Sequence, residues 1–398
     1  MSEKRKHVED LRGASRLAAE ATRGVVDLVE AMHHTIGGGP RMLNRPLEGA
    51  VRVATAPVYG GIRAVTDLVG ASIDVALALL APLLGESAPG PEREAILAVL
   101  NGVLGDYLDE TSNPLAIEMR FRHEGRPLML EREALRATYP QAGGKLLILV
   151  HGSCMSERQW SRHGHDHGAA LARDLGYSPV YLHYNSGLHI STNGRALAAM
   201  LEQLVDAWPA PLEELVVLGH SMGGLVARSA CHYGGLGGHR WRRTLRKLIC
   251  LGSPHHGAPL ERGGNWIDTM LVVSRYSAPL ARLGQIRSAG VTDMRFGNVR
   301  DEDWQGRGRF ERGTDRRVPL PLPAGVECYA IAATSAPTPR AKLPSDGIVP
   351  VESALGRCER SDLALAFPDS HRWIAFGAGH LDLLDRPDVY ATLRSWLA

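Results

Sequence analysis

The stretch Leu212–Arg228 constrains the fold and chemistry of this chain more than any other. Leu215–Leu218 is a short apolar run typical of a buried strand, and a helical pattern follows Ser221. Gly219 and Gly223 lie two residues to either side of that serine. A direct turn from strand to helix crowds its neighbours, and glycine suits such positions because it has no Cβ. The sequence therefore predicts a tight junction that holds the Ser221 hydroxyl clear of the backbone.

In this setting the Gly-x-Ser-x-Gly pattern resembles the nucleophile elbow of α/β-hydrolases. The rest of the sequence agrees, because apolar strand patterns alternate with helical patterns from about residue 145 onwards. Such alternation is typical of a doubly wound, mostly parallel sheet, so we predict an α/β-hydrolase fold. We expect strands at 116–122, 128–130, 145–150, 179–184, 215–218, 245–251, 326–332 and 373–376, and helices at 91–108, 167–175, 192–208, from 222, and at 387–397.

The sequence suggests two parts of different character. Residues 1–112 form an N-terminal helical segment with little that resembles a strand, and residues 113–398 form the catalytic domain. Regular alternation breaks at about 258–323, where we expect a cap or lid insertion. The N-terminal segment either packs on the catalytic domain or makes peripheral contact with a membrane or hydrophobic polymer. An alternative function is that these helices carry the main role of the protein, by binding a membrane, a polymer or a partner. Its shortage of large aromatic residues weakens the membrane interpretation.

The composition sets further limits. An apolar fraction of 44% supports a large core, and a net charge of +2 gives no reason to expect a nucleic-acid partner. The five cysteines are odd in number and show no CxxC spacing, which favours reduced thiols in the cytoplasm over a disulfide framework. The basic N-terminus precedes no apolar run typical of a signal peptide, and the apolar stretch Val69–Leu84 is interrupted and short for a membrane span. We therefore expect a soluble, cytoplasmic protein.

A nucleophilic serine needs a base to take its proton and a carboxylate to orient that base. In α/β-hydrolases these partners follow in the order serine, acid, histidine. His380 lies directly after the last expected strand, at the same sheet edge as Ser221, and is the predicted base. Asp346 follows the preceding strand and is the predicted acid, although an Asp-Gly pair is also common turn chemistry.

Hydrolysis through such a serine also needs backbone N–H groups that stabilise the developing oxyanion. Met222, the residue after the serine, supplies one candidate. The loop after the strand at 145–150 supplies the second, with Ser153 as the first choice and Cys154 as the alternative. We interpret the Cys154 side chain as a packing residue, because no separate base accompanies it.

Five short motifs occur in the order found in bacterial triacylglycerol lipases, and the chain also resembles esterases of the GPI-inositol-deacylase type. The motifs are His151-Gly152, Gly219-His220-Ser221-Met222-Gly223-Gly224, Gly252-Ser253-Pro254-His255-His256-Gly257, Asp346-Gly347-Ile348-Val349-Pro350 and His380-Leu381-Asp382. The resemblance covers about residues 145–398. It implies hydrolysis of a carboxylic ester through an acyl-enzyme, with Ser221, Asp346 and His380 as the triad. Thioester hydrolysis and acyl transfer would use the same residues.

The sequence gives no strong signal for a metal or cofactor, and we expect none. Some bacterial lipases hold calcium through an aspartate two positions after the catalytic histidine, where this chain has Asp382, but no acidic partner lies between Cys328 and Pro344. The histidine-rich run 163–167 lacks a clear helical pair and is expected to be a polar loop. The arginine-rich run 295–317 interleaves acidic residues and is expected to be a solvated loop. The predicted partner is an ester substrate, and the oligomeric state stays open.

Overall fold

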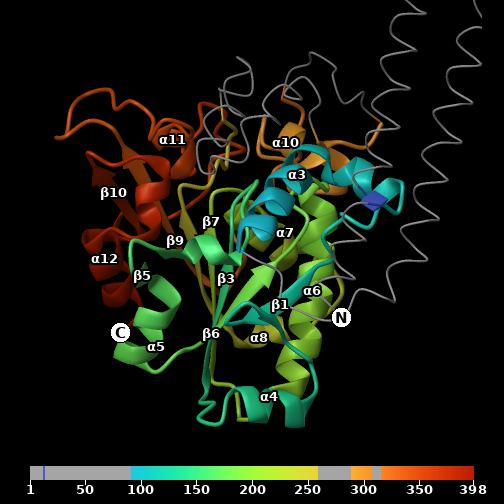
Figure 1. Ribbon diagram of the computed structural model, residues 1–398. Helices are drawn as coiled ribbons and strands as arrows, with labels where there is room; N and C mark the ends of the chain where they lie inside the picture. The colour runs from blue at the N-terminus through green and yellow to red at the C-terminus, as the bar shows by residue number, and fades with distance from the viewer. Residues whose placement is uncertain (1–11, 14–90, 259–287, 307–314) are drawn as a thin grey trace, which may run out of the picture. The chain divides into compact units, whose positions relative to one another are not determined.

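The computed structural model describes residues 12–13, 91–258, 288–306 and 315–398 (Figure 1). The chain divides into two compact units, residues 1–91 with 108–116 and residues 92–107 with 117–398. Of the described elements from residue 91 onwards, all strands and helices belong to the second unit, apart from the two ends of α3 (Pro91–Glu110). The helical expectations before residue 91 lie outside the described residues, apart from 12–13, as do 259–287 and 307–314 of the expected insertion. The boundary suggested at residue 112 stays a prediction.

The second unit is built on a mixed, mostly parallel sheet of eight strands in the order β10-β9-β8-β7-β3-β6-β1-β2. Strands β3, β6, β7, β8, β9 and β10 run parallel, whereas β1 pairs antiparallel with both β6 and β2. The strands are β1 (Arg120–His123), β2 (Arg126–Pro127), β3 (Lys145–Val150), β6 (Ser178–His183), β7 (Glu214–His220), β8 (Leu245–Leu251), β9 (Glu327–Thr334) and β10 (Arg372–Phe376). The predicted α/β fold class is confirmed.

Helices cover both faces of this sheet, with α6 and α7 beside one face and α5 and α12 beside the other (Figure 1). The longer helices are α3 (Pro91–Glu110), α4 (Arg132–Thr138), α5 (His167–Leu175), α6 (Ile190–Ala207), α7 (Met222–Leu236) and α12 (Pro387–Leu397). The short ones are α8 (Trp241–Thr244), α10 (Ala289–Asp293) and α11 (Val351–Ala354), with 3-10 turns η2 (Glu157–Trp160), η5 (Asp301–Asp303), η6 (Asp369–His371) and η7 (His380–Leu384). Among the helices that the structure describes, no helix combines the length and apolar composition of a membrane span.

The central strands are apolar on successive residues because both of their faces are covered. All of Leu146–Val150 in β3 is fully buried. On one face, Leu147 and Leu149 pack in a single core with residues of the neighbouring strands and of α5 and α12. The other face lies beneath α6 and α7, where Gly194 of α6 closely approaches Ser229 of α7. The five cysteines are free thiols.

The edge of the sheet differs from the sequence prediction. Leu128–Leu130 is not a strand, and the strand expected from residue 116 begins only at Arg120. The turn between β1 and β2 explains the difference, because Glu124 (φ 48°) and Gly125 (φ 74°) both have positive φ, as in a two-residue type I′ hairpin. This turn fixes the pair Arg126 and Pro127 as β2. A similar turn at 163–164 joins β4 (Ser161–Arg162) and β5 (His165–Asp166), where a polar loop was expected.

The register of the parallel strands determines where the loops meet. Val150 at the end of β3 pairs with Gly219 of β7, and His220 pairs with Leu251 at the end of β8. Carboxyl ends of parallel strands open at one edge of a sheet, which is where α/β proteins place their ligands. The loops after β3, β7 and β8 therefore open side by side at that edge.

Candidate active site

Ser221 occupies a strained junction between β7 and α7. Its backbone has φ 54° and ψ −124°, a conformation that costs a residue with a side chain roughly 1–3 kcal/mol. The Ser221 N–H donates to the carbonyl oxygen of Leu251 at 2.8 Å, which ties the junction to β8. The strain is thus held in place by the surrounding sheet.

The two glycines of the junction are required by space. A Cβ on Gly219 would lie 2.5 Å from the backbone nitrogen of Gly224, and one on Gly223 would lie 2.2 Å from the carbonyl oxygen of Val150. Both distances are far below van der Waals contact, and both neighbours are backbone atoms that cannot turn away. The close approach of α7 to β3 therefore depends on these glycines.

His380 and Asp346 are in direct contact in the interior. The Nδ1 of His380 lies 2.7 Å from Oδ2 of Asp346, and both side chains are almost fully buried. The other oxygen of Asp346 accepts from the N–H groups of Ile348 at 2.9 Å and Val349 at 2.7 Å. Because a carboxylate accepts, Nδ1 of the neutral imidazole carries the proton and Nε2 is left as an acceptor. In the described part of the chain, this buried Nε2 has no hydrogen-bond partner.

The His380 ring lies against the backbone that holds the serine junction. A Cβ on Gly252 would be 3.0 Å from Cε1 of His380, and Gly252 directly follows Leu251, the acceptor for the Ser221 N–H. The backbone N–H of His380 also donates to the carbonyl oxygen of Asp346 at 3.0 Å. The histidine, the acid and the serine junction thus meet at one edge of the sheet, although their catalytic roles stay a prediction.

The loop after β3 lies against the serine on another side. A Cβ on Gly152 would approach Cβ of Ser221 to 3.0 Å. Ser153 and Met222 are fully buried, and neither backbone N–H has an acceptor among the described residues. Cys154, the alternative donor, already donates its N–H to Oγ of Ser186 at 3.1 Å. This geometry favours Ser153 over Cys154 as the second oxyanion donor.

Cys154 itself does not have the environment of a nucleophile. Its side chain is buried, and this burial raises the pKa of the thiol to about 11. A thiol with such a pKa stays protonated at neutral pH and is a weak nucleophile. Its interpretation as a packing residue is therefore supported.

His220, the residue before Ser221, was not among the predicted site residues, but it contacts the predicted base. Its Nε2 lies 3.2 Å from the carbonyl oxygen of His380, and the two rings are 4.7 Å apart between centroids. Since a carbonyl only accepts, Nε2 carries the proton. Burial, with His380 nearby, lowers the pKa of His220 well below its ordinary value, so the ring is neutral at neutral pH. Its position next to the serine was the available sequence signal.

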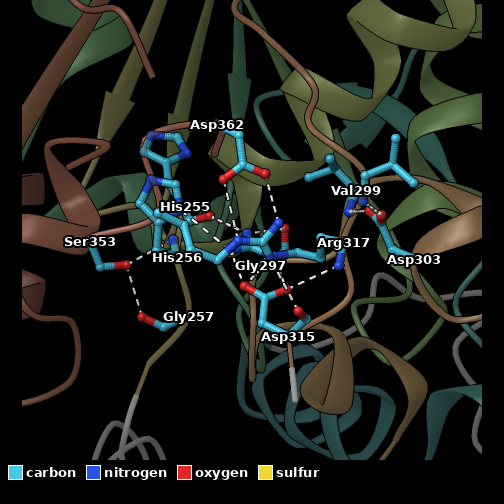
Figure 2. A network of polar contacts seen from close by, with 12 residues as sticks. His255, His256, Gly257, Gly297, Val299, Asp303, Asp315, Arg317, Ser353 and Asp362 are labelled. Carbon is cyan, nitrogen blue, oxygen red and sulfur yellow. Dashed lines mark hydrogen bonds and ion pairs between the residues drawn. The ribbon is translucent and has the colours of Figure 1, made fainter. Parts of the chain in front are cut away.

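The arginine-rich segment is not simply a solvated loop, and that expectation is wrong for Arg317. Figure 2 shows this side chain at the centre of a polar network, where it is buried and paired with Asp315 at 2.8 Å. Its Nη1 also donates to the carbonyl oxygen of His255 at 2.8 Å. Arg317 thereby anchors the segment after residue 315 to the loop that follows β8. Arg317 can be buried because its charge is paired with Asp315 and its other N–H groups donate to backbone carbonyl oxygens. A sequence pattern of mixed charges does not reveal such pairing.

The residues considered for metal binding have other partners. His165 Nε2 lies 2.8 Å from His167 Nδ1, and His167 Nε2 lies 3.0 Å from the carbonyl oxygen of Leu383. Asp382 accepts the N–H of Gly379 at 2.8 Å and so caps the turn that begins at His380. Within the described ranges, no group of three or more His, Cys, Asp or Glu side chains is arranged to hold a metal ion.

One known family model matches part of the chain that carries this site. Residues 141–308 match the family model described as the PGAP1-like alpha/beta domain. This part of the chain is similar to the PGAP1-like domain, and the match covers less than half of the chain. It includes Ser153, Ser221 and Met222, whereas Asp346 and His380 lie beyond the matched residues. Together with the sheet order and the serine junction, the match identifies the fold as that of the α/β-hydrolases.

Solved structures give more distant likenesses. The mature lipase BlEst2 of Bacillus licheniformis aligns with 16% identity over 65% of this chain and 94% of its own, with a TM-score of 0.42. A lipase-esterase related protein of Clostridium acetobutylicum ATCC 824 aligns with 11% identity over 70% and 99%, with a TM-score of 0.37. The Pyrococcus furiosus esterase Pf2001 aligns with 15% identity over 64% and 85%, with a TM-score of 0.36. At these scores nothing about activity follows from them. Comparison with the sequences of curated proteins finds no match.

Proposed function

We propose that this protein is a serine hydrolase that cleaves a carboxylic ester with an apolar acyl group through an acyl-enzyme. One observation carries the proposal: a serine held in a strained strand-to-helix junction shares a sheet edge with a buried histidine whose Nδ1 is bonded to Asp346. The same histidine keeps its Nε2 without a partner in the described structure. These are the roles of nucleophile, base and orienting acid.

The proposed reaction begins at Ser221. As Oγ attacks the ester carbonyl carbon, its proton passes to Nε2 of His380, and Asp346 stabilises the resulting imidazolium through Nδ1–H. The carbonyl π electrons move to the oxygen, which accepts hydrogen bonds from the N–H groups of Met222 and Ser153. When the tetrahedral intermediate collapses, the C–O bond to the alcohol breaks and Nε2 returns the proton to the leaving oxygen. Water then repeats the two steps on the acyl-enzyme and releases the acid.

Labelling with an aryl phosphonate tests the chemistry directly. Phosphonates react with activated serines, so we expect one label per chain, located by mass spectrometry on the peptide that contains Ser221. Ser221→Ala should abolish both labelling and hydrolysis of p-nitrophenyl esters. Ser229→Ala is the matched control, because Ser229 is a buried serine two turns along α7 whose hydroxyl bonds the carbonyl oxygen of Val299. Labelling of the Ser221→Ala protein at the native rate would refute the proposal.

The substrate class needs a separate measurement. A series of p-nitrophenyl esters of increasing acyl length should show kcat/KM rising with length if the acyl site is apolar. Thioesters of the same acyl groups, and the same esters with a competing alcohol, distinguish ester hydrolysis from thioester hydrolysis and from acyl transfer. A series in which the acetate ester is the best substrate would contradict an apolar acyl site.

A further inference from the structure

Helix α3 lies directly against the loop that follows β3. A Cβ on Gly102 would be 2.3 Å from Sγ of Cys154, 2.8 Å from its Cα and 2.9 Å from its backbone nitrogen. Two of these three contacts are with backbone atoms, so the glycine lets the helix touch the loop itself rather than a side-chain tip. The helix is fixed at this point, because Oγ of Ser288 donates to the carbonyl oxygen of Gly102 at 2.7 Å.

A second contact holds the same loop residue. The Cys154 N–H donates to Oγ of Ser186 at 3.1 Å, and Ser186 lies in the connection between β6 and α6. This connection also packs on α3, since Nδ2 of Asn185 donates to the carbonyl oxygen of Gly105 at 2.8 Å. The loop residue Cys154 is thus clamped between the helix and a connection that the helix supports.

The clamp acts on a strained piece of backbone. Cys154 has a φ of 59°, in the left-handed region that residues other than glycine rarely adopt. Such a conformation persists only where the surroundings determine it. The peptide that joins Ser153 to Cys154 is held by Ser186 at its N–H, and β3 holds the chain at Val150. Ser153, whose N–H has no acceptor in the described structure, is suspended between these two supports.

We propose that Gly102 and Ser186 are positioning residues that hold the Ser153 N–H in place for the oxyanion. In this role α3 supports the chemistry from outside the family-matched segment, which begins at residue 141. The inference rests on the proposed ester hydrolysis. An N–H donor contributes only where its hydrogen meets the developing charge, so a small displacement of this loop lowers the rate of the chemical step. Both residues act through their contacts with Cys154.

Two substitutions test the clamp. Gly102→Ala pushes a methyl group into Cys154, and Ser186→Ala removes the hydroxyl that accepts the Cys154 N–H without adding bulk. Loss of a whole oxyanion donor costs on the order of 100- to 1,000-fold in kcat, so displacement should lower kcat about tenfold or more while KM stays within about twofold. Ala98→Gly is the control, because Ala98 is a buried residue of α3. Removing its methyl group weakens the helix without adding atoms near the loop.

The decisive readout is the rate ratio between an aryl ester and its thionoester. Sulfur accepts hydrogen bonds more weakly than oxygen, so a damaged oxyanion site slows the ester more than the thionoester. We expect the ratio to fall at least threefold in Gly102→Ala and Ser186→Ala and to keep its native value in Ala98→Gly. Equal slowing of both substrates, or unchanged kcat in folded variants, would overturn the positioning role. Absence of serine labelling in the native protein would instead refute the hydrolase itself. If Gly102→Ala does not fold, the Ser186→Ala ratio decides.

Discussion

At the scale of single residues, Asp346 determines which nitrogen of His380 carries the proton. Asp346→Asn replaces an acceptor by an amide that can donate to Nδ1, and this favours the tautomer whose Nε2 already holds a proton. We expect kcat to fall on the order of 10³- to 10⁴-fold with the fold unchanged. Asp382→Asn is the control in the same loop, because its amide oxygen can still accept the Gly379 N–H. Steady-state rates on one aryl ester measure both variants, and a fall below tenfold for Asp346→Asn would remove Asp346 from its assigned role.

His220 acts on the same histidine through the backbone. Its Nε2–H bonds the carbonyl oxygen of His380, and such a hydrogen bond contributes about 1 kcal/mol, or roughly fivefold in rate if it serves only to position the ring. We expect His220→Ala to lower kcat by about that factor and His220→Gln, which keeps a donor, to restore part of it. His371→Ala is the control, because His371 also bonds a backbone carbonyl oxygen, that of Cys328. His371 lies directly before β10, at the opposite end of that strand from His380. Equal rates for the Ala and Gln variants would show that the bond does not matter.

At the scale of elements, the start of α7 sets the distance between the serine and the loop after β3. In Gly223→Ala the new Cβ would lie 2.2 Å from the Val150 carbonyl oxygen, so the helix must move away from β3. We expect a loss of about 1–3 kcal/mol in the free energy of unfolding together with a loss of activity. Gly235→Ala is the control in the same helix, because a Cβ on Gly235 would have no atom of another element within 4 Å. This variant should stabilise the protein by about 0.5–1 kcal/mol and keep native activity. Denaturant titration and ester hydrolysis on both variants check this, and native activity in Gly223→Ala would contradict it.

The elements also show what the sequence could predict. The strand Lys145–Val150 was predicted with its observed bounds, because a strand covered on both faces is apolar throughout. The prediction of a strand at Leu128–Leu130 was wrong, because apolar residues at a sheet edge need not be buried, and Met129 is 63% exposed. The order of Ser221, Asp346 and His380 along the chain, together with their places after strands that end at one sheet edge, selected the candidates, and their roles stay a prediction. The contact between Gly102 and Cys154 was beyond prediction, because it depends on how a helix packs against a loop 52 residues later.

At the scale of the whole molecule, buried neutral histidines make stability depend on pH. Burial lowers the pKa of His167 to about 4 and that of His151 to about 3, and those of His220 and His255 lie well below the ordinary value of 6.5. In the unfolded chain these rings titrate near 6.5. Between pH 6.5 and about 4 the unfolded state therefore binds more protons than the folded state, and the free energy of unfolding falls as the pH falls.

Each such histidine contributes about 1.4 kcal/mol per pH unit within this window, and the contributions of several rings add. We expect the urea midpoint of unfolding to be constant above about pH 7.5 and to fall steeply between pH 6.5 and 5. The fall should be larger than the protonation of a single histidine can cause. His167→Gln should reduce the slope of the free energy of unfolding against pH by the equivalent of about one proton. The glutamine amide cannot titrate but can still donate to the Leu383 carbonyl oxygen. A midpoint that does not change between pH 7.5 and 5 would mean that these rings are protonated in the folded protein, and their hydrogen bonds would then have to be reassigned.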